Sequence, residues 1–174
     1  QGWLKDAFAF MKTRADSYLS LNTNPYTAYQ SAAGRRAMHS HVATLAMTGW
    51  LTGEQKYFDK ATSIIMPVAD LTTTSTFFAL NEHLAVSDAG HTFAIAYDWL
   101  HPYLTAPQRA LLRNEVIQYG QWLYDYTVRK EYYGRYDPVP LSCNHNSVHH
   151  GALGLCALAL GAVVGCDRPP SGDM

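Results

Sequence analysis

Residues 143–151 read Cys-Asn-His-Asn-Ser-Val-His-His-Gly and run directly into an apolar segment, residues 152–164. So uniform an apolar segment predicts a helix that is buried in the fold, with the polar cluster on its first turn at the rim or floor of a cavity. The first turn of a helix also presents unpaired N–H groups and a partial positive charge. We therefore expect an anionic ligand, a carboxylate or a sulfate, beside this cluster.

Length and charge limit the classes of protein that the chain can belong to. Its 174 residues have the length of one domain, and its formal net charge is −1. The sequence has no basic run, so we expect no nucleic-acid partner and no polybasic membrane anchor. The longest apolar run is shorter than the ~20 residues that span a bilayer, so we expect no membrane partner. The three cysteines suggest neither a disulfide framework nor a zinc ribbon and are expected to be small buried thiols.

The spacing of apolar residues predicts an all-α protein, because no stretch alternates with a period of two. Pro67 is expected to stop the third helix, Pro102 to bend or end the fourth, and Thr105 to cap the fifth at its N-terminus. The tyrosine-bearing residues 131–142 are expected to form a loop. The helices predicted before the apolar segment cover residues 3–21, 35–51, 54–66, 88–103 and 107–130.

A sequence pattern that occurs three times suggests a repeat of helical hairpins. His41, His91 and His149 each lie four residues before an aliphatic residue and five before a small one. After the first two of these histidines, the helix is followed by a turn and a second helix, as in a hairpin repeat. The histidines could therefore line one cavity, although a histidine repeated in register is often only a packing residue.

Two phrases of the sequence resemble the heparinase II/III-like polysaccharide lyases. One is AYDWLHPYLT at residues 96–105, and the other is the Asn-His-Asn-Ser-Val entry of residues 144–148 into an apolar helix that contains glycines. The resemblance covers roughly residues 36–164. It implies helical hairpins forming part of an incomplete (α/α) toroid, whose inner helices line a cleft for an acidic polysaccharide, and it implies a secreted or periplasmic protein.

The chain also departs from the family. The family usually has tryptophan where this chain has His145, its toroid is longer, and β-sheet domains follow the toroid. Its catalytic tyrosine usually lies well after the asparagine motif and would fall beyond Met174. The resemblance therefore implies that residues 1–174 are the first half of a toroid from a larger enzyme, with further domains of the same protein as partners.

Lyase chemistry next to a uronic acid needs a neutralised carboxylate, a base for the C5 proton and an acid for the leaving oxygen. An asparagine amide can hydrogen-bond the carboxylate as charge grows there, which makes Asn144 the first candidate and Asn146 the second. Histidine titrates near neutral pH, so His145 or His149 could be the base. The alternative for Asn144 is a helix N-cap. No cofactor is implied.

Other side chains could bind the substrate. Arg36 could pair with a carboxylate or sulfate, and Tyr136 could stack on a sugar or supply an acid, while His41 and His91 could line the cavity. Each also has a structural explanation, namely a solvent-facing arginine, a loop anchor or a helix-packing histidine. His145 and His149 have the spacing of a metal pair, but no third ligand is evident, so we predict no metal.

Two other functions remain open at this stage. A glycoside hydrolase on a similar toroid would need two carboxyl groups across the scissile bond. The sequence offers Asp88, Asp98 and Glu82, and none of them belongs to the polar cluster of residues 143–151. A noncatalytic helical module that binds glycans or another protein is the third reading. The polymer itself could be a heparan sulfate, a chondroitin or an alginate.

Overall fold

The structure, a computed structural model, describes residues 2–22, 28–29, 31–72, 83–129 and 144–166. All regular elements in these ranges are helical, which confirms the all-α prediction. They are α1 (Gly2–Leu19), α3 (Ala32–Thr52), α4 (Gln55–Thr72), α5 (His83–Leu100), α6 (Ala106–Tyr124) and α7 (Asn144–Cys166), with a 3-10 turn at His101–Tyr103 and a π-helical turn at Asp125–Arg129.

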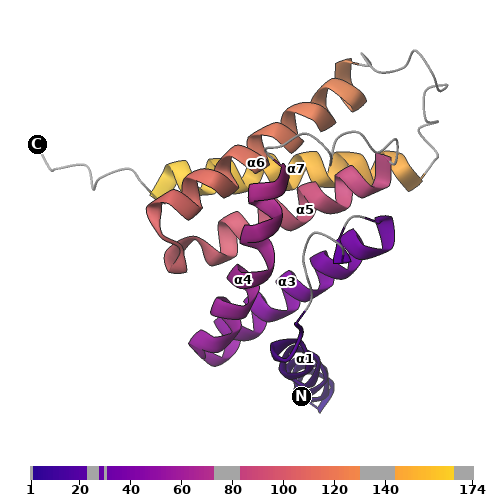
Figure 1. Cartoon of the computed structure of the whole chain (residues 1–174). Helices are drawn as coiled ribbons and strands as arrows, with labels where there is room; N and C mark the ends of the chain where they lie inside the picture. Colours follow the sequence, from indigo (N-terminus) through magenta and orange to yellow (C-terminus); the bar gives the residue numbers. More distant parts are fainter. Residues whose placement is uncertain (1, 23–27, 30, 73–82, 130–143, 167–174) are drawn as a thin grey trace, which may run out of the picture.

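Three helices, α3, α5 and α7, run parallel to one another. The ring of His39 lies beside that of His91, and further along the same pair of helices the Trp50 indole nitrogen donates to the Trp99 carbonyl at 2.8 Å. The N-terminal ends of all three lie on the right in Figure 1, and α6 runs back in the opposite direction. With α5 between α3 and α7, the arrangement is a stack of hairpins, although closure into a toroid stays a prediction.

Two helix boundaries depend on residues that the sequence singles out, Pro67 and Thr105. Helix α4 continues through Pro67 instead of stopping there. Pro67 and Ser63 are both exposed, so the carbonyl that loses its N–H partner can be hydrated. At the other boundary the prediction is confirmed, because Thr105 caps α6 and forms a capping box with Gln108.

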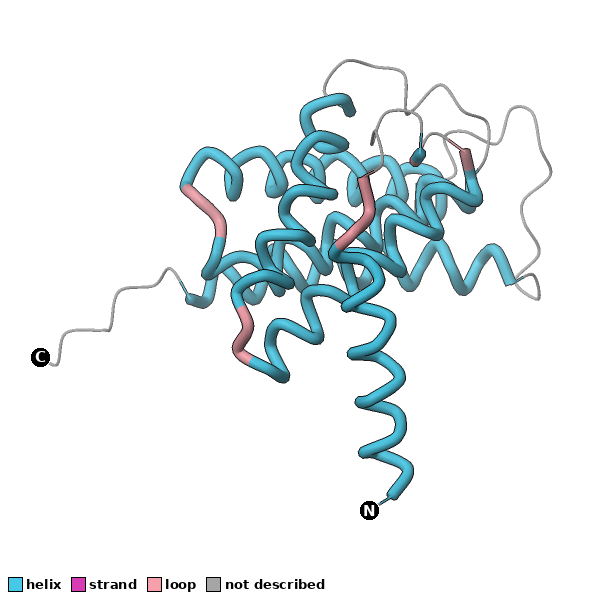
Figure 2. Tube along the Cα trace, turned by 60° about the horizontal axis from the view of Figure 1, so that its bottom comes forward, coloured by secondary structure: helices cyan, strands magenta, loops and turns pink. Residues whose placement is uncertain are grey.

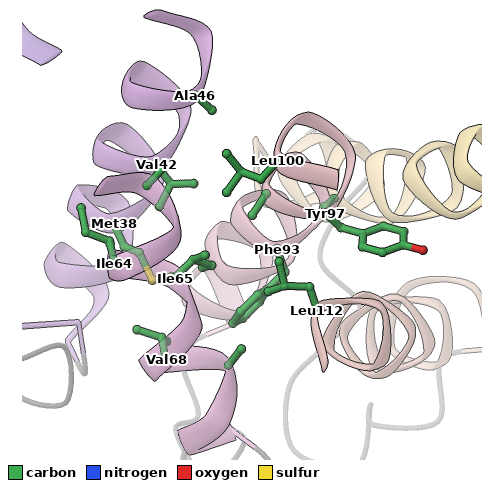
Figure 3. Packing of buried hydrophobic residues seen from close by; sticks show 14 of the residues in the cluster. Met38, Val42, Ala46, Ile64, Ile65, Val68, Phe93, Tyr97, Leu100 and Leu112 are labelled. Atoms are coloured by element: carbon green, nitrogen blue, oxygen red, sulfur yellow. The ribbon is translucent and has the colours of Figure 1, made fainter. Parts of the chain in front are cut away.

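The core is built from the inward faces of α3 to α6, shown in Figure 3. Its contents are aliphatic and aromatic side chains with almost no exposed surface, and Tyr97 is among them. The labelled members from α3 are Met38, Val42 and Ala46, those from α4 are Ile64, Ile65 and Val68, and those from α5 and α6 are Phe93, Tyr97, Leu100 and Leu112. This core fixes the positions of α3 and α5, on which the polar cluster described below depends.

Helix α1 packs on this core only through its C-terminal half, where Ala15 and Tyr18 are buried. The Tyr57 hydroxyl of α4 donates to Asp16 at 2.6 Å and holds the two helices together. The N-terminal half of α1 extends away from the other helices in Figure 2 and exposes Trp3, among other apolar side chains.

Gly49 allows α3 and α4 to approach each other closely, and the approach can be tested. A Cβ at position 49 would lie 2.7 to 2.9 Å from three carbons of the Phe58 ring, which is itself stacked on Tyr103 with 3.7 Å between ring centroids. We expect Gly49→Ala to destabilise the protein by about 1–3 kcal/mol, because the ring has to move.

Urea denaturation with circular dichroism measures this change. Gly154→Ala is the matched control, since a Cβ there meets nothing within 4 Å and the substitution should stabilise its helix by about 0.5–1 kcal/mol. Equal midpoints for the two variants would contradict the close approach.

Candidate functional site

Cys156 sets the register between α5 and α7. Its thiol is buried and points at the Gly90 carbonyl, with 3.7 Å between sulfur and oxygen. A Cβ at Gly90 would lie 3.7 Å from the sulfur, and a Cβ at Gly120 of α6 would lie 3.3 Å from the Cys156 Cβ. The side chain therefore occupies the space left by two glycines, and burial raises its pKa to about 12. The prediction of a small buried thiol is confirmed for Cys156.

This register places His91 beside the third turn of α7. A Cβ on Gly151 would lie 3.5 Å from His91 Nε2. His91 Nε2 therefore faces α7, and the backbone of Ser87, one turn earlier in α5, acts to raise the pKa of His91. Partial burial lowers the pKa of His91, which favours the neutral ring.

A second histidine and a carboxylate complete a polar cluster with His91. The His39 ring of α3 lies 6.0 Å from the His91 ring, centroid to centroid, and its Nδ1 lies 3.5 Å from the Thr92 hydroxyl. Asp88 is one turn before His91 on α5. We call Asp88, His91, His39 and Thr92 the α3/α5 cluster.

Charges in and around the α3/α5 cluster act on one another. Burial raises the pKa of the Asp88 carboxyl, and the charges of Arg36, His39, His91 and Arg35 act in the opposite direction. Burial lowers the pKa of His39, and Asp88 partly counteracts that effect. The site therefore combines two imidazoles, whose lowered pKa favours the neutral form, with a partly buried carboxyl group.

The predicted histidines do not all meet at this place. His41 lies on the other side of α3 from His39, since residues two apart on a helix face apart. Its Nδ1 is 3.1 Å from the Tyr29 hydroxyl and its ring is 4.4 Å from that of Tyr18. His149 is buried, with its ring edge-on to Tyr126 at 5.2 Å. Only His91 of the three belongs to the α3/α5 cluster.

The remaining predicted site residues have different outcomes. Asn144, His145 and Asn146 form the first turn of α7, as the sequence predicts, but their side chains lie outside what the structure describes. Tyr136 also lies outside the described residues. Arg36 is exposed, and its charge reaches Asp88.

Arg35, which precedes Arg36, has a different environment. Arg35 is buried, and its charge acts on Tyr119 together with that of Glu115. Of the two arginines, only Arg36 is therefore available to a ligand.

An apolar groove continues the α5/α7 seam beyond the α3/α5 cluster. It has a volume of about 450 Å³ and begins one helical turn after His91 and Gly151. Trp99 and Leu158 line it, and Asp98 is its one acidic lining residue. The seam is thus polar near the N-terminal ends of the helices and apolar further along.

Other observations bear on partners. Within the described ranges, no three His, Cys, Asp or Glu side chains are placed to hold a metal ion. The described helices include none with both the length and the apolar composition needed to cross a bilayer. Comparison with protein-family models, curated proteins and solved structures finds no match for this chain.

Sequence reasoning missed two members of the α3/α5 cluster, His39 and Thr92, and gave a third, Asp88, a different role. The repeat points to His41 and not to His39, because His41 lies at the same position of the repeat as His91 and His149. Asp88 was considered only as a hydrolase carboxylate. Its spacing of three residues from His91 was the available signal, because residues three apart share a helix face.

The charge of Asp88 should be visible in the titration of both cluster histidines. Asp88 raises the pKa of His39 and of His91, so removing its negative charge in Asp88→Asn should lower both values further. Imidazole NMR signals followed against pH measure this shift. Asp98→Asn, an exposed carboxylate on the same helix, is the control and should leave both unchanged. Unmoved histidines in Asp88→Asn would contradict the cluster.

Proposed function

We propose that this chain is the toroid portion of a polysaccharide lyase that cleaves a uronic-acid-containing polymer by β-elimination. One observation carries the proposal. The parallel packing of α3, α5 and α7 places Arg36, His91 and the Asn144-His145-Asn146 turn in the N-terminal halves of three neighbouring helices. The two resembling phrases of the sequence support the same reaction, and a secreted or periplasmic location accompanies the proposal.

The electrostatics of that end suit an acidic polymer. Each helix contributes a partial positive charge at its N-terminus, and three such ends lie side by side (Figure 1). Arg36 adds a full positive charge close to α5. The exposed positions Ser147 and Gly151 keep this side of α7 open to a ligand. A uronate carboxylate is therefore attracted to the place where the asparagine turn begins.

The proposed reaction follows from the residue types at that end. The Asn144 amide hydrogen-bonds the uronate carboxylate and stabilises the negative charge that develops as the C5 proton leaves. His145 accepts this proton, the bond from C4 to the glycosidic oxygen breaks, and a C4–C5 double bond forms. The leaving oxygen takes a proton from an acid, for which a tyrosine is the suitable type.

We propose His91 in place of His149 as the second candidate for the base. The ring of His149 is 1% exposed and packs against Tyr126, so a substrate would reach it only after a movement of the helices. His91 is half-buried, and its Nε2 faces the open side of α7. The lowered pKa of His91 also keeps its lone pair available at neutral pH.

A glycoside hydrolase is less compatible with the described carboxylates. Asp88 and Asp98 lie ten residues apart on one helix, which corresponds to about 15 Å along its axis. Inverting hydrolases hold their two carboxyl groups at most ~9.5 Å apart, and retaining ones closer still. Glu115 is buried in the core beside Tyr119.

The lyase proposal predicts an unsaturated product. We expect ultraviolet absorbance to rise when the whole enzyme that contains this toroid portion is mixed with at least one polymer from a panel of alginate, chondroitin and heparan sulfate. Asn144→Ala should lower the rate about 10²–10³-fold, because the developing charge loses its hydrogen-bond donor. If no polymer gives an absorbing product, the lyase assignment is wrong and a binding module becomes the better description.

A methyl group placed against His91 offers an independent test. Gly151→Ala adds a Cβ 3.5 Å from Nε2, a contact that the fold tolerates but that obstructs the lone pair. If His91 rather than His145 takes the C5 proton, the rate should be at least about 10-fold lower, in line with the loss of a general base. Gly154→Ala places the same methyl group in open space one turn later and should keep the wild-type rate. Equal rates for both variants would remove His91 from the reaction.

A further inference from the structure

The N-terminal half of α1 carries an apolar surface that the described part of its own chain leaves uncovered. All of residues 2–10, which form the α1 arm, are exposed. Trp3, Ala7 and Phe10 follow one another at helical spacing. Leu4 and Phe8 lie beside them, so these side chains form a single apolar stripe. Short helices are marginal in water without tertiary packing, so the stripe indicates a surface that a partner covers.

A second apolar surface is the groove of the α5/α7 seam. The groove has a volume of about 450 Å³, and Leu158, whose side chain is 69% exposed, forms part of its wall. Its lining runs along α7 from Leu155 to Gly161, which corresponds to about 9 Å of helix axis. The stripe on the α1 arm, from Trp3 to Phe10, corresponds to about 10.5 Å. The two apolar surfaces therefore match in length.

The charges beside the two surfaces are complementary. Asp98 is exposed and is the one charged residue among those that line the groove. Lys5 of the α1 arm lies about 60° from Phe8 around the helix axis, at the edge of the apolar stripe. Neither Lys5 nor Asp98 forms an ion pair with another described residue. Docking of the arm in the groove allows these two charges to pair.

The α1 arm does not reach the groove of its own chain. Helix α1 packs on α3 and α4, and the hydrogen bond from Tyr57 to Asp16 holds its C-terminal half there. Helices α3 and α5 lie between α1 and α7, so α1 and the groove are on different sides of the molecule (Figure 1). In Figure 2 the arm points away from the other helices. An arm therefore reaches the groove from a second molecule.

We propose that two copies of this chain associate by docking the α1 arm of one copy in the α5/α7 groove of the other. Trp3 and the other apolar side chains of the arm pack against Trp99 and Leu158 in the groove. Lys5 of one copy pairs with Asp98 of the other. Two-fold symmetry satisfies both grooves at once, because each copy then receives the arm of the other. This association goes beyond the proposed lyase reaction and does not depend on it.

Sedimentation velocity of the full chain across an about 100-fold range of concentration tests the association, which follows mass action. We expect the wild type to shift from monomer to dimer as its concentration rises. Trp3→Asp on the arm and Leu158→Asp in the groove should each raise the dissociation constant at least about 10-fold, because a charge would be buried against apolar groups. Leu51→Asp is the matched control, since Leu51 is 59% exposed outside both surfaces, and it should associate as the wild type does.

Exchanging the two charges tests the register of the contact. Lys5→Glu and Asp98→Lys should each raise the dissociation constant about 2–5-fold, which is the contribution expected of an exposed ion pair. The double variant should restore wild-type association, because opposite charges face each other again. A double variant that associates more weakly than either single variant would contradict this pairing.

A mixture of the two aspartate variants distinguishes docking of arm in groove from other pairings. Trp3→Asp keeps an intact groove and Leu158→Asp keeps an intact arm, so the mixture should form a complex that neither variant forms alone. Circular dichroism confirms that each variant is folded. A mixture without this complex, or equal weakening by Leu51→Asp, would overturn the proposal.

Two further outcomes would assign the α1 arm to a different partner. Unchanged association in a folded Leu158→Asp would overturn the proposal and indicate that the arms of two copies pair with each other. A wild type that stays monomeric at every concentration would overturn it as well. Binding of that monomer to phospholipid vesicles, lost in Trp3→Asp, would then assign the arm to a lipid surface.

Discussion

The close contact of α5, α6 and α7 around Cys156 is the constraint on which the candidate site depends. A thiol fits where two glycines, Gly90 and Gly120, leave no side chain between the helices. Gly90 directly precedes His91, and Cys156 lies little more than one turn after Gly151. The contact between Gly90 and Cys156 therefore also fixes the positions of His91 and Gly151. A contact with no chemical role thus determines which way the Nε2 of His91 faces. A larger residue at any of the three positions would change the separation or register of the helices.

Parallel packing gives the site its electrostatic character. In a helical hairpin, the second helix brings the chain back to the end at which the first helix began. The helices α3, α5 and α7 therefore all begin at the same end (Figure 1). Partial positive charges that would be minor singly add up at that end. Arg36 and the α3/α5 cluster lie in the N-terminal halves of α3 and α5, while the part of the α5/α7 seam further along is an apolar groove. An extended ligand along the seam would therefore meet a polar environment at one end and an apolar one at the other.

The positions of three histidines show what a sequence repeat predicts and what it does not. The repeat phase singles out His41, His91 and His149, and each does lie on one of the three parallel helices. Their rings nevertheless have different neighbours: Tyr18 for His41, Gly151 for His91 and Tyr126 for His149. The π-helical turn places Tyr126 against α7, and such a turn leaves no clear signal in the sequence. If a repeat is aligned one or two residues away from its true position, the predicted side-chain direction changes by about 100° or 200° around the helix axis. This is enough to single out His41 where His39 is the residue that meets His91.

The sequence by itself determined the helical class, most helix boundaries, the Thr105 cap and the start of α7 at the Asn-His turn. These features depend on local periodicity and on hydrogen bonds within a few residues, which a single chain segment specifies. Only the tertiary structure decided that Asp88 and His39 join His91, that His41 and His149 do not, and that Arg35 is buried while Arg36 is exposed. Those outcomes depend on the rotation and register of whole helices, and these are fixed by contacts between residues far apart in the chain, such as Gly90 with Cys156.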